Sequence, residues 1–141
     1  MKKKVAINGF GRIGRLVYRA FLERLNEFRD LYEISYINDL ADIDSNIHLL
    51  KYDSIHGPLN KEINKVSDEQ FSIEKNTVTV TSERNPIDLK WKGKDVDIIL
   101  ECTGVFASKE KAMSHIESGA SKVIVSAPCS GADITLSLIH I

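Results

Sequence analysis

Apolar and polar positions change their spacing several times along the first third of the chain. Residues 5–7 and 34–37 are short, mostly apolar runs bounded by polar residues, which predicts two buried strands. Between them, apolar residues recur at intervals of three and four, which predicts an amphipathic helix. Its expected apolar face carries Ile13, Leu16, Val17, Ala20, Phe21 and Leu25. The order is therefore strand, helix, strand.

The middle of the chain predicts a short helix and then a hairpin. Residues 42–45 supply acidic and hydroxyl N-cap candidates for a helix that extends to about Lys51. Residues 62–81 have the pattern of short strands, and residues 77–81 alternate strictly with β-branched side chains. This segment is expected to be a hairpin inserted between the two halves of a larger sheet.

Two further buried strands are predicted at residues 97–102 and 122–126, because both runs are almost continuously apolar. A helix is expected between them, with Ser108 as its N-cap and Gly119 as its C-terminal stop. Strands alternating with helices favour an α/β fold with right-handed crossovers. In such a fold, ligands bind at the carboxyl ends of the parallel strands.

A glycine-rich turn joins the first strand to the first helix. Gly9, Gly11 and Gly14 have the G-x-G-x-x-G spacing of a dinucleotide-binding turn. Gly9 permits a sharp turn, Gly11 leaves room for a pyrophosphate, and Gly14 lets the helix pack close to the strand. The helix N-terminus offers N–H groups and a positive dipole end to phosphates. The motif favours a Rossmann-type fold, a doubly wound, mostly parallel sheet with an inserted antiparallel hairpin.

An acidic residue follows the second strand. Asp39 lies 25 residues after Gly14, near the position at which a carboxylate meets the adenosine ribose. The alternative is that Asp39 caps the next helix. If Asp39 binds ribose, it favours NAD over the 2′-phosphorylated cofactor, because a carboxylate repels a 2′-phosphate.

Composition narrows the class of protein. At 141 residues, one domain is expected, and a net charge of −1 gives no electrostatic argument for nucleic acid or an anionic membrane. No apolar run approaches the roughly 20 residues of a membrane span. The two cysteines, Cys102 and Cys129, have no metal-like spacing with histidines, so no metal site is predicted. A reducing, cytoplasmic compartment is expected.

Six blocks of sequence stand out along the chain: residues 8–15 (NGFGRIGR), 37–39 (IND), 50–57 (LKYDSIHG), 82–86 (SERNP), 101–106 (ECTGVF) and 126–128 (SAP). Taken together, these blocks resemble the phosphorylating glyceraldehyde-3-phosphate dehydrogenases of bacterial type. They occur in that family's order and spacing, and the resemblance extends from Met1 to about Thr135.

The resemblance implies that the chain binds NAD. Arg12 and Ile13 would present backbone N–H groups to the pyrophosphate, and Arg84 would lie over the adenine side. Thr103, Gly104 and Phe106 would line the path to the nicotinamide ribose, with Ser126 near the nicotinamide. The implied cofactor-binding set is Gly9, Phe10, Gly11, Arg12, Ile13, Gly14, Asn38, Asp39, Arg84, Thr103, Gly104, Phe106 and Ser126. Alternatively, Arg84 is a solvated loop charge, and Thr103, Gly104 and Ser126 only end their strands.

The resemblance also implies the activity of a longer protein. The family oxidises glyceraldehyde 3-phosphate with phosphate and NAD to 1,3-bisphosphoglycerate and NADH, as a homotetramer. Its nucleophilic cysteine lies in a Ser-Asn-Ala-Ser-Cys motif that is missing from these residues, as is its histidine base, so no catalytic residue is assigned and the 141 residues alone are expected to be inactive. Cys102 and Cys129 are expected to be bystanders.

The end of the sequence departs from the family pattern. Residues 1–135 are expected to be an incomplete NAD-binding Rossmann domain, residues 136–141 a non-native tail, and the catalytic domain absent. Two alternatives stay open: an erythrose-4-phosphate dehydrogenase, and a non-catalytic NAD-binding module.

Overall fold

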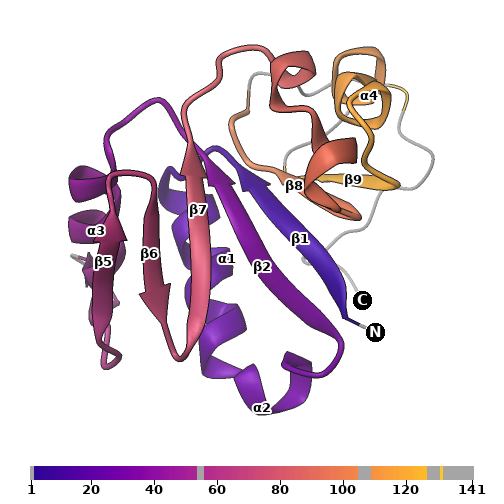
Figure 1. The fold of residues 1–141 in the computed structure, drawn as a ribbon. Helices are drawn as coiled ribbons and strands as arrows, with labels where there is room; N and C mark the ends of the chain where they lie inside the picture. Colours follow the sequence, from indigo (N-terminus) through magenta and orange to yellow (C-terminus); the bar gives the residue numbers. More distant parts are fainter. Residues whose placement is uncertain (1, 54–55, 105–108, 127–130, 132–141) are drawn as a thin grey trace.

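The structure, a computed structural model, describes residues 2–53, 56–104, 109–126 and 131. Its centre is a seven-stranded sheet in the order β5-β6-β7-β2-β1-β8-β9 (Figure 1). The strands are β1 (Lys3–Asn8), β2 (Tyr32–Asn38), β5 (Ile63–Ser67), β6 (Gln70–Ile73), β7 (Asn76–Thr81), β8 (Ile98–Glu101) and β9 (Lys122–Val125). A separate two-stranded sheet pairs β3 (Tyr52–Asp53) with β4 (Gly57–Pro58).

Five of the strands in the large sheet run parallel. β7, β2, β1, β8 and β9 pair as parallel neighbours, whereas β5 and β6 add two antiparallel strands at one edge. The antiparallel hairpin expected over residues 62–81 is thus present. Its last strand, β7, also joins the parallel sheet through β2, which the sequence pattern did not predict.

Helices cover both faces of the sheet, which confirms the doubly wound α/β prediction. One apolar core joins the sheet to α1 (Arg12–Glu23) and α3 (Ile43–Lys51), and α2 (Leu25–Phe28) follows α1. A second core on the opposite face includes the 3-10 helices η1 (Pro86–Leu89) and η2 (Trp91–Lys94). α4 (Lys109–Glu117) packs against η1 and β9 (Figure 1).

Strand alternation assigns side chains to these two cores. In β1, Val5 and Ile7 lie in the α1 core, whereas Ala6 lies in the core with Trp91. Successive side chains of a strand point to opposite faces, so Asn8 shares the face of Ala6. The polar end of β1 therefore lies on the η1, η2 and α4 side.

The buried face of α1 differs from the expected one. Gly14, Tyr18, Arg19 and Leu22 are buried, whereas Ile13 is 50% exposed and Ala20 is also exposed. The spacing of apolar residues did not predict this face of α1, because the buried positions include a glycine and a tyrosine. It also missed Arg19, whose guanidinium is buried where it donates to the carbonyls of Leu50 and Lys51 at the end of α3.

The helix boundaries follow local capping. The carboxylate of Asp42 accepts the Ser45 N–H at 2.7 Å, so Asp42 is the N-cap of α3 and Asp39 is not. Gly119 follows α4 with φ of 120°, as expected for a helix stop, and a Cβ there would stand 2.3 Å from the Lys92 nitrogen. The predicted N-cap Ser108 lies outside the described residues. Within the described part, no helix has the length and apolarity to cross a membrane.

Candidate functional site

A cleft of about 550 Å³ opens at the carboxyl ends of β1, β2 and β8. Several predicted site residues line it together: Gly9, Gly11, Asn38, Asp39, Arg84 and Thr103. Asn8, at the end of β1, and Cys102, directly after β8, line it as well. Leu40 and Glu83, which the sequence did not single out for the site, also contribute. Most of these lie at or directly after a strand end, which is the sequence signal that identifies them.

The glycine turn has the shape that the sequence predicted. Gly9 has φ of 91°, and a Cβ on it would stand 2.7 to 2.9 Å from atoms of Thr103. A Cβ on Gly14 would stand 2.2 Å from the Gly9 carbonyl oxygen and 3.2 Å from the Ile7 side chain. By contrast, no described atom lies within 4 Å of a Cβ on Gly11. The turn thus leaves open space only where a ligand would approach the backbone.

The N-terminus of α1 supplies donors beside this space. Its first intrahelical bond runs from the Arg15 N–H to the Gly11 carbonyl at 3.0 Å, so the N–H groups of residues 12–14 have no acceptor within the helix. The Arg12 guanidinium lies 3.5 Å from the Asp53 carboxylate. Ile13 is half exposed at the same end. Donors and a positive dipole end suit an anionic group here.

Asp39 is held at the end of β2 by backbone donors. One carboxylate oxygen accepts the Phe10 N–H at 2.9 Å, and the other accepts the Ala41 N–H at 3.1 Å. The Asp39 N–H donates to the Thr81 carbonyl at 3.0 Å. The carboxylate therefore has a fixed orientation beside the glycine turn, and each oxygen keeps further acceptor capacity.

Arg84 lines the cleft from the loop after β7, and Asn38 secures that loop. The Asn38 side chain donates to the Glu83 carbonyl at 2.8 Å and accepts the Glu83 N–H at 2.8 Å. Arg84 itself is exposed. The two-point contact places the backbone just before Arg84 against the end of β2.

The loop after β8 forms another wall. Thr103 lines the cleft, and Gly104 follows it with φ of 77°. Ser126 follows β9 and donates its N–H to the Glu101 carbonyl at 3.0 Å, which places it at the same edge of the sheet. Phe106 lies outside the described residues.

The described cysteine at this edge is not an activated nucleophile. Burial raises the pKa of the Cys102 thiol, the charge of Glu101 adds to that increase, and a hydrogen bond with Ser126 opposes it. The thiol is therefore protonated at neutral pH, and a thiol is a much weaker nucleophile than a thiolate. That Cys102 is a bystander stays a prediction from the sequence. Cys129 lies outside the described residues.

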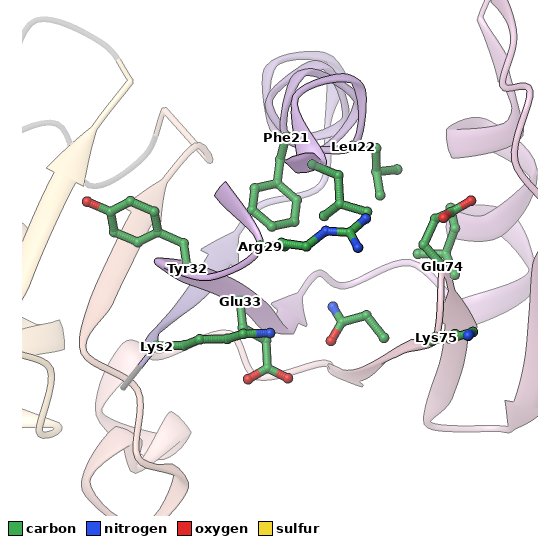
Figure 2. Close-up of a pocket in the computed structure, with 11 residues that line it drawn as sticks. Lys2, Phe21, Leu22, Arg29, Tyr32, Glu33, Glu74 and Lys75 are labelled. Carbon is green, nitrogen blue, oxygen red and sulfur yellow. The ribbon is translucent and has the colours of Figure 1, made fainter. Parts of the chain in front are cut away.

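A second pocket, of about 380 Å³, lies away from this cleft (Figure 2). Its lining residues come from the start of β2, the end of α1, α2 and the β6–β7 turn, and include Phe21, Arg29, Tyr32, Glu33 and Lys75. The C-terminal end of α1 carries the negative end of the helix dipole. A pyrophosphate is therefore favoured at the carboxyl-edge cleft rather than in this pocket.

Comparison with known proteins agrees with the site geometry. A family model described as glyceraldehyde 3-phosphate dehydrogenase, NAD binding domain, matches residues 3–109. The chain is 46% identical over 136 residues to a glyceraldehyde-3-phosphate dehydrogenase of Cereibacter sphaeroides and 47% identical over 136 residues to one of Xanthobacter flavus. Each alignment covers 96% of this chain and 39% of the relative, so the chain spans about two-fifths of the length of these curated relatives. The chain belongs to the glyceraldehyde 3-phosphate dehydrogenase NAD-binding domain family, and NAD is its cofactor.

Proposed function

We propose that the chain binds NAD in the carboxyl-edge cleft. The pyrophosphate lies at the N-terminus of α1, beside Gly11 and the N–H groups of Arg12 and Ile13. The adenosine ribose hydroxyls donate to Asp39, and Arg84 lies on the adenine side. The nicotinamide half extends toward Thr103, Gly104, Phe106 and Ser126.

The position of Asp39 is the observation that carries this proposal. Its two oxygens are held at 2.9 and 3.1 Å by the N–H groups of Phe10 and Ala41, directly beside the glycine turn. A fixed carboxylate accepts hydrogen bonds from two ribose hydroxyls without losing side-chain entropy on binding. It also opposes a 2′-phosphate, which makes NAD the preferred form.

NAD accepts a hydride when it is bound, and the residues of this chain bind and orient it. For the whole protein we propose the activity of a phosphorylating glyceraldehyde-3-phosphate dehydrogenase, acting on glyceraldehyde 3-phosphate and phosphate as a homotetramer. The 141 residues would supply the NAD-binding part, residues 1–135, and no catalytic cysteine or histidine. The identities of 46% and 47% to enzymes of that name favour this activity over erythrose-4-phosphate oxidation or a non-catalytic module.

Titration calorimetry with NAD and NADP tests the binding proposal. We expect the purified chain to bind NAD at least about tenfold more tightly than NADP, and Asp39→Asn to weaken NAD binding and reduce that preference. Asp68→Asn removes an exposed carboxylate from the β5–β6 turn and serves as the matched control. Equal affinity for the two cofactors, or unchanged NAD binding in Asp39→Asn, would contradict the proposal.

A further inference from the structure

Polar side chains form a hydrogen-bonded row across the carboxyl ends of four neighbouring strands. Thr81, Asn38, Asn8 and Glu101 occupy paired positions on β7, β2, β1 and β8. Asn8 and Asn38 are each 3% exposed, and Glu101 is 1% exposed. The row is therefore buried beneath the cleft.

The hydrogen bonds of this row all point toward Glu101. The Thr81 hydroxyl donates to Asn38 Oδ1 at 2.7 Å, and Asn38 Nδ2 donates to Asn8 Oδ1 at 2.8 Å. Asn8 Nδ2 then donates to Glu101 Oε1 at 2.6 Å. Each amide accepts on one side and donates on the other, so Glu101 is the final acceptor.

A second chain of donors reaches Glu101 from the other side. The Trp91 indole N–H, which can only donate, lies 3.0 Å from His115 Nδ1. Nδ1 is therefore the acceptor, and the ring proton of His115 is on Nε2. That nitrogen donates to Glu101 Oε1 at 2.8 Å. His115 is fully buried.

The remaining oxygen of Glu101 holds Thr103. Oε2 accepts the Thr103 N–H at 3.0 Å and the Thr103 hydroxyl at 2.5 Å. With donors on both oxygens, Glu101 is satisfied as an ionised carboxylate. Thr103 in turn lies so close to Gly9 that a Cβ on Gly9 would be 2.8 Å from the Thr103 nitrogen.

We propose that Glu101 is a positioning residue for the cofactor, oriented by His115 and Trp91. It fixes Thr103 against the Gly9 turn, and through Asn8 and Asn38 the same hydrogen-bonded row secures Glu83 in the loop after β7. The two walls of the cleft are thus set by one buried carboxylate. This inference rests on the proposed binding of NAD in the cleft.

Glu101→Gln is the direct test. A glutamine presents an amide N–H₂ to donors that need an acceptor, so the Thr103 N–H or the donors of Asn8 and His115 lose their partner. We expect the Thr103 amide to exchange with solvent at least about tenfold faster, measured by NMR without cofactor. We expect the NAD dissociation constant to rise about tenfold, measured by calorimetry well below the unfolding temperature. Glu33→Gln, the same change of charge beside the second pocket, is the control.

Two variants of His115 separate positioning from general packing. His115→Gln keeps an N–H donor within reach of Glu101 Oε1, whereas His115→Leu keeps apolar volume and removes the donor. We expect His115→Gln to keep an NAD affinity close to that of the wild type, with the Thr103 amide still exchanging slowly with solvent. We expect His115→Leu to bind NAD more weakly and to show faster exchange of that amide. The positioning role would be overturned if both variants lost NAD affinity and protection of the Thr103 amide equally, in proportion to their loss of folding stability.

The two proposals fail in distinguishable ways. If the wild-type chain binds NAD with NMR shifts at Asp39 and Gly11, but Glu101→Gln leaves both the affinity and the Thr103 exchange unchanged, the positioning role is overturned and the binding proposal stands. If the wild-type chain shows no NAD-dependent shifts at those residues, NAD binding in this cleft is overturned, and the positioning role with it.

Discussion

The carbonyl oxygen of Gly9 occupies the space into which a side chain on Gly14 would extend, since a Cβ built on Gly14 would stand 2.2 Å from that oxygen. Such a contact is far inside van der Waals distance, and the clashing atom belongs to the backbone. The first turn of α1 is therefore pressed directly against the end of β1.

Because of this contact, substitution by alanine should affect stability differently at two glycines of the same motif. We expect Gly14→Ala to lower the free energy of unfolding by about 3 kcal/mol, because helix and turn must separate. Gly11→Ala meets no described atom within 4 Å, and its cost to stability stays within about 1 kcal/mol. It should instead weaken NAD binding, because the new methyl group lies where the pyrophosphate approaches. Urea unfolding and calorimetry measure the two effects, and equal stability losses would contradict this division.

The buried guanidinium of Arg19 gives a second prediction. Its Nε and Nη2 donate to the Leu50 carbonyl at 3.1 and 2.8 Å, and Nη2 also reaches the Lys51 carbonyl at 3.2 Å. Arg19→Met keeps the apolar stem but leaves the α3 carbonyls without these donors, so we expect a loss of about 2 kcal/mol.

Arg19→Lys should not restore this stability, since an ammonium lacks the planar fork that bridges both carbonyls. Arg24→Met, at an exposed position just after α1, is the control and should change stability little. Urea unfolding of Arg19→Met, Arg19→Lys and Arg24→Met measures the free energy of unfolding of each variant against the wild type. A lysine variant as stable as the wild type would show that charge alone suffices.

The buried carboxylate of Glu101 predicts that the free energy of unfolding falls at acidic pH. Burial raises the pKa of this carboxyl, but hydrogen bonds from His115, Thr103 and Asn8 outweigh burial and leave the pKa below its ordinary value of 4.5. A group whose pKa is lowered by folding stabilises the fold above its unfolded pKa. That contribution is lost as the pH falls from about 4.5 through the lower folded value.

We therefore expect the stability difference between the wild type and Glu101→Gln to shrink as the pH is lowered through this range. Urea unfolding at a series of pH values measures it, with Glu33→Gln as the reference for the other carboxylates. A difference that stays constant with pH would mean that folding does not lower the pKa of Glu101.

Cys102 gives a prediction about reactivity. Because burial and the charge of Glu101 raise the pKa of its thiol, alkylation by iodoacetamide should still accelerate as the pH passes the ordinary thiol value of 9.0. Cys102 also lines the cleft, so saturating NAD should slow the reaction. Mass spectrometry resolves Cys102 from Cys129. A rate that levels off below pH 9.0 would contradict the raised pKa.

Local sequence signals predicted the parts of the site that depend on local backbone geometry. Gly9 and Gly14 follow from motif spacing, and the strand that precedes Asp39 was enough to place that residue at the cleft. His115 was not identified, because its role depends on two residues distant in sequence: Trp91, 24 residues earlier, and Glu101 at the end of β8. The buried face of α1 was not predicted, because apolar periodicity does not identify a buried glycine or an arginine that donates to the end of another helix.

The direction of the hydrogen bonds in the row at the strand ends restricts how this protein can evolve. Asn8 must donate toward Glu101 and accept from Asn38, so an aspartate at position 8 would place two carboxylates side by side. No single exchange between amide and carboxylate at Asn8, Asn38 or Glu101 keeps every donor matched to an acceptor. In an alignment of related sequences, we therefore expect positions 8, 38 and 101 to be retained together or to change together.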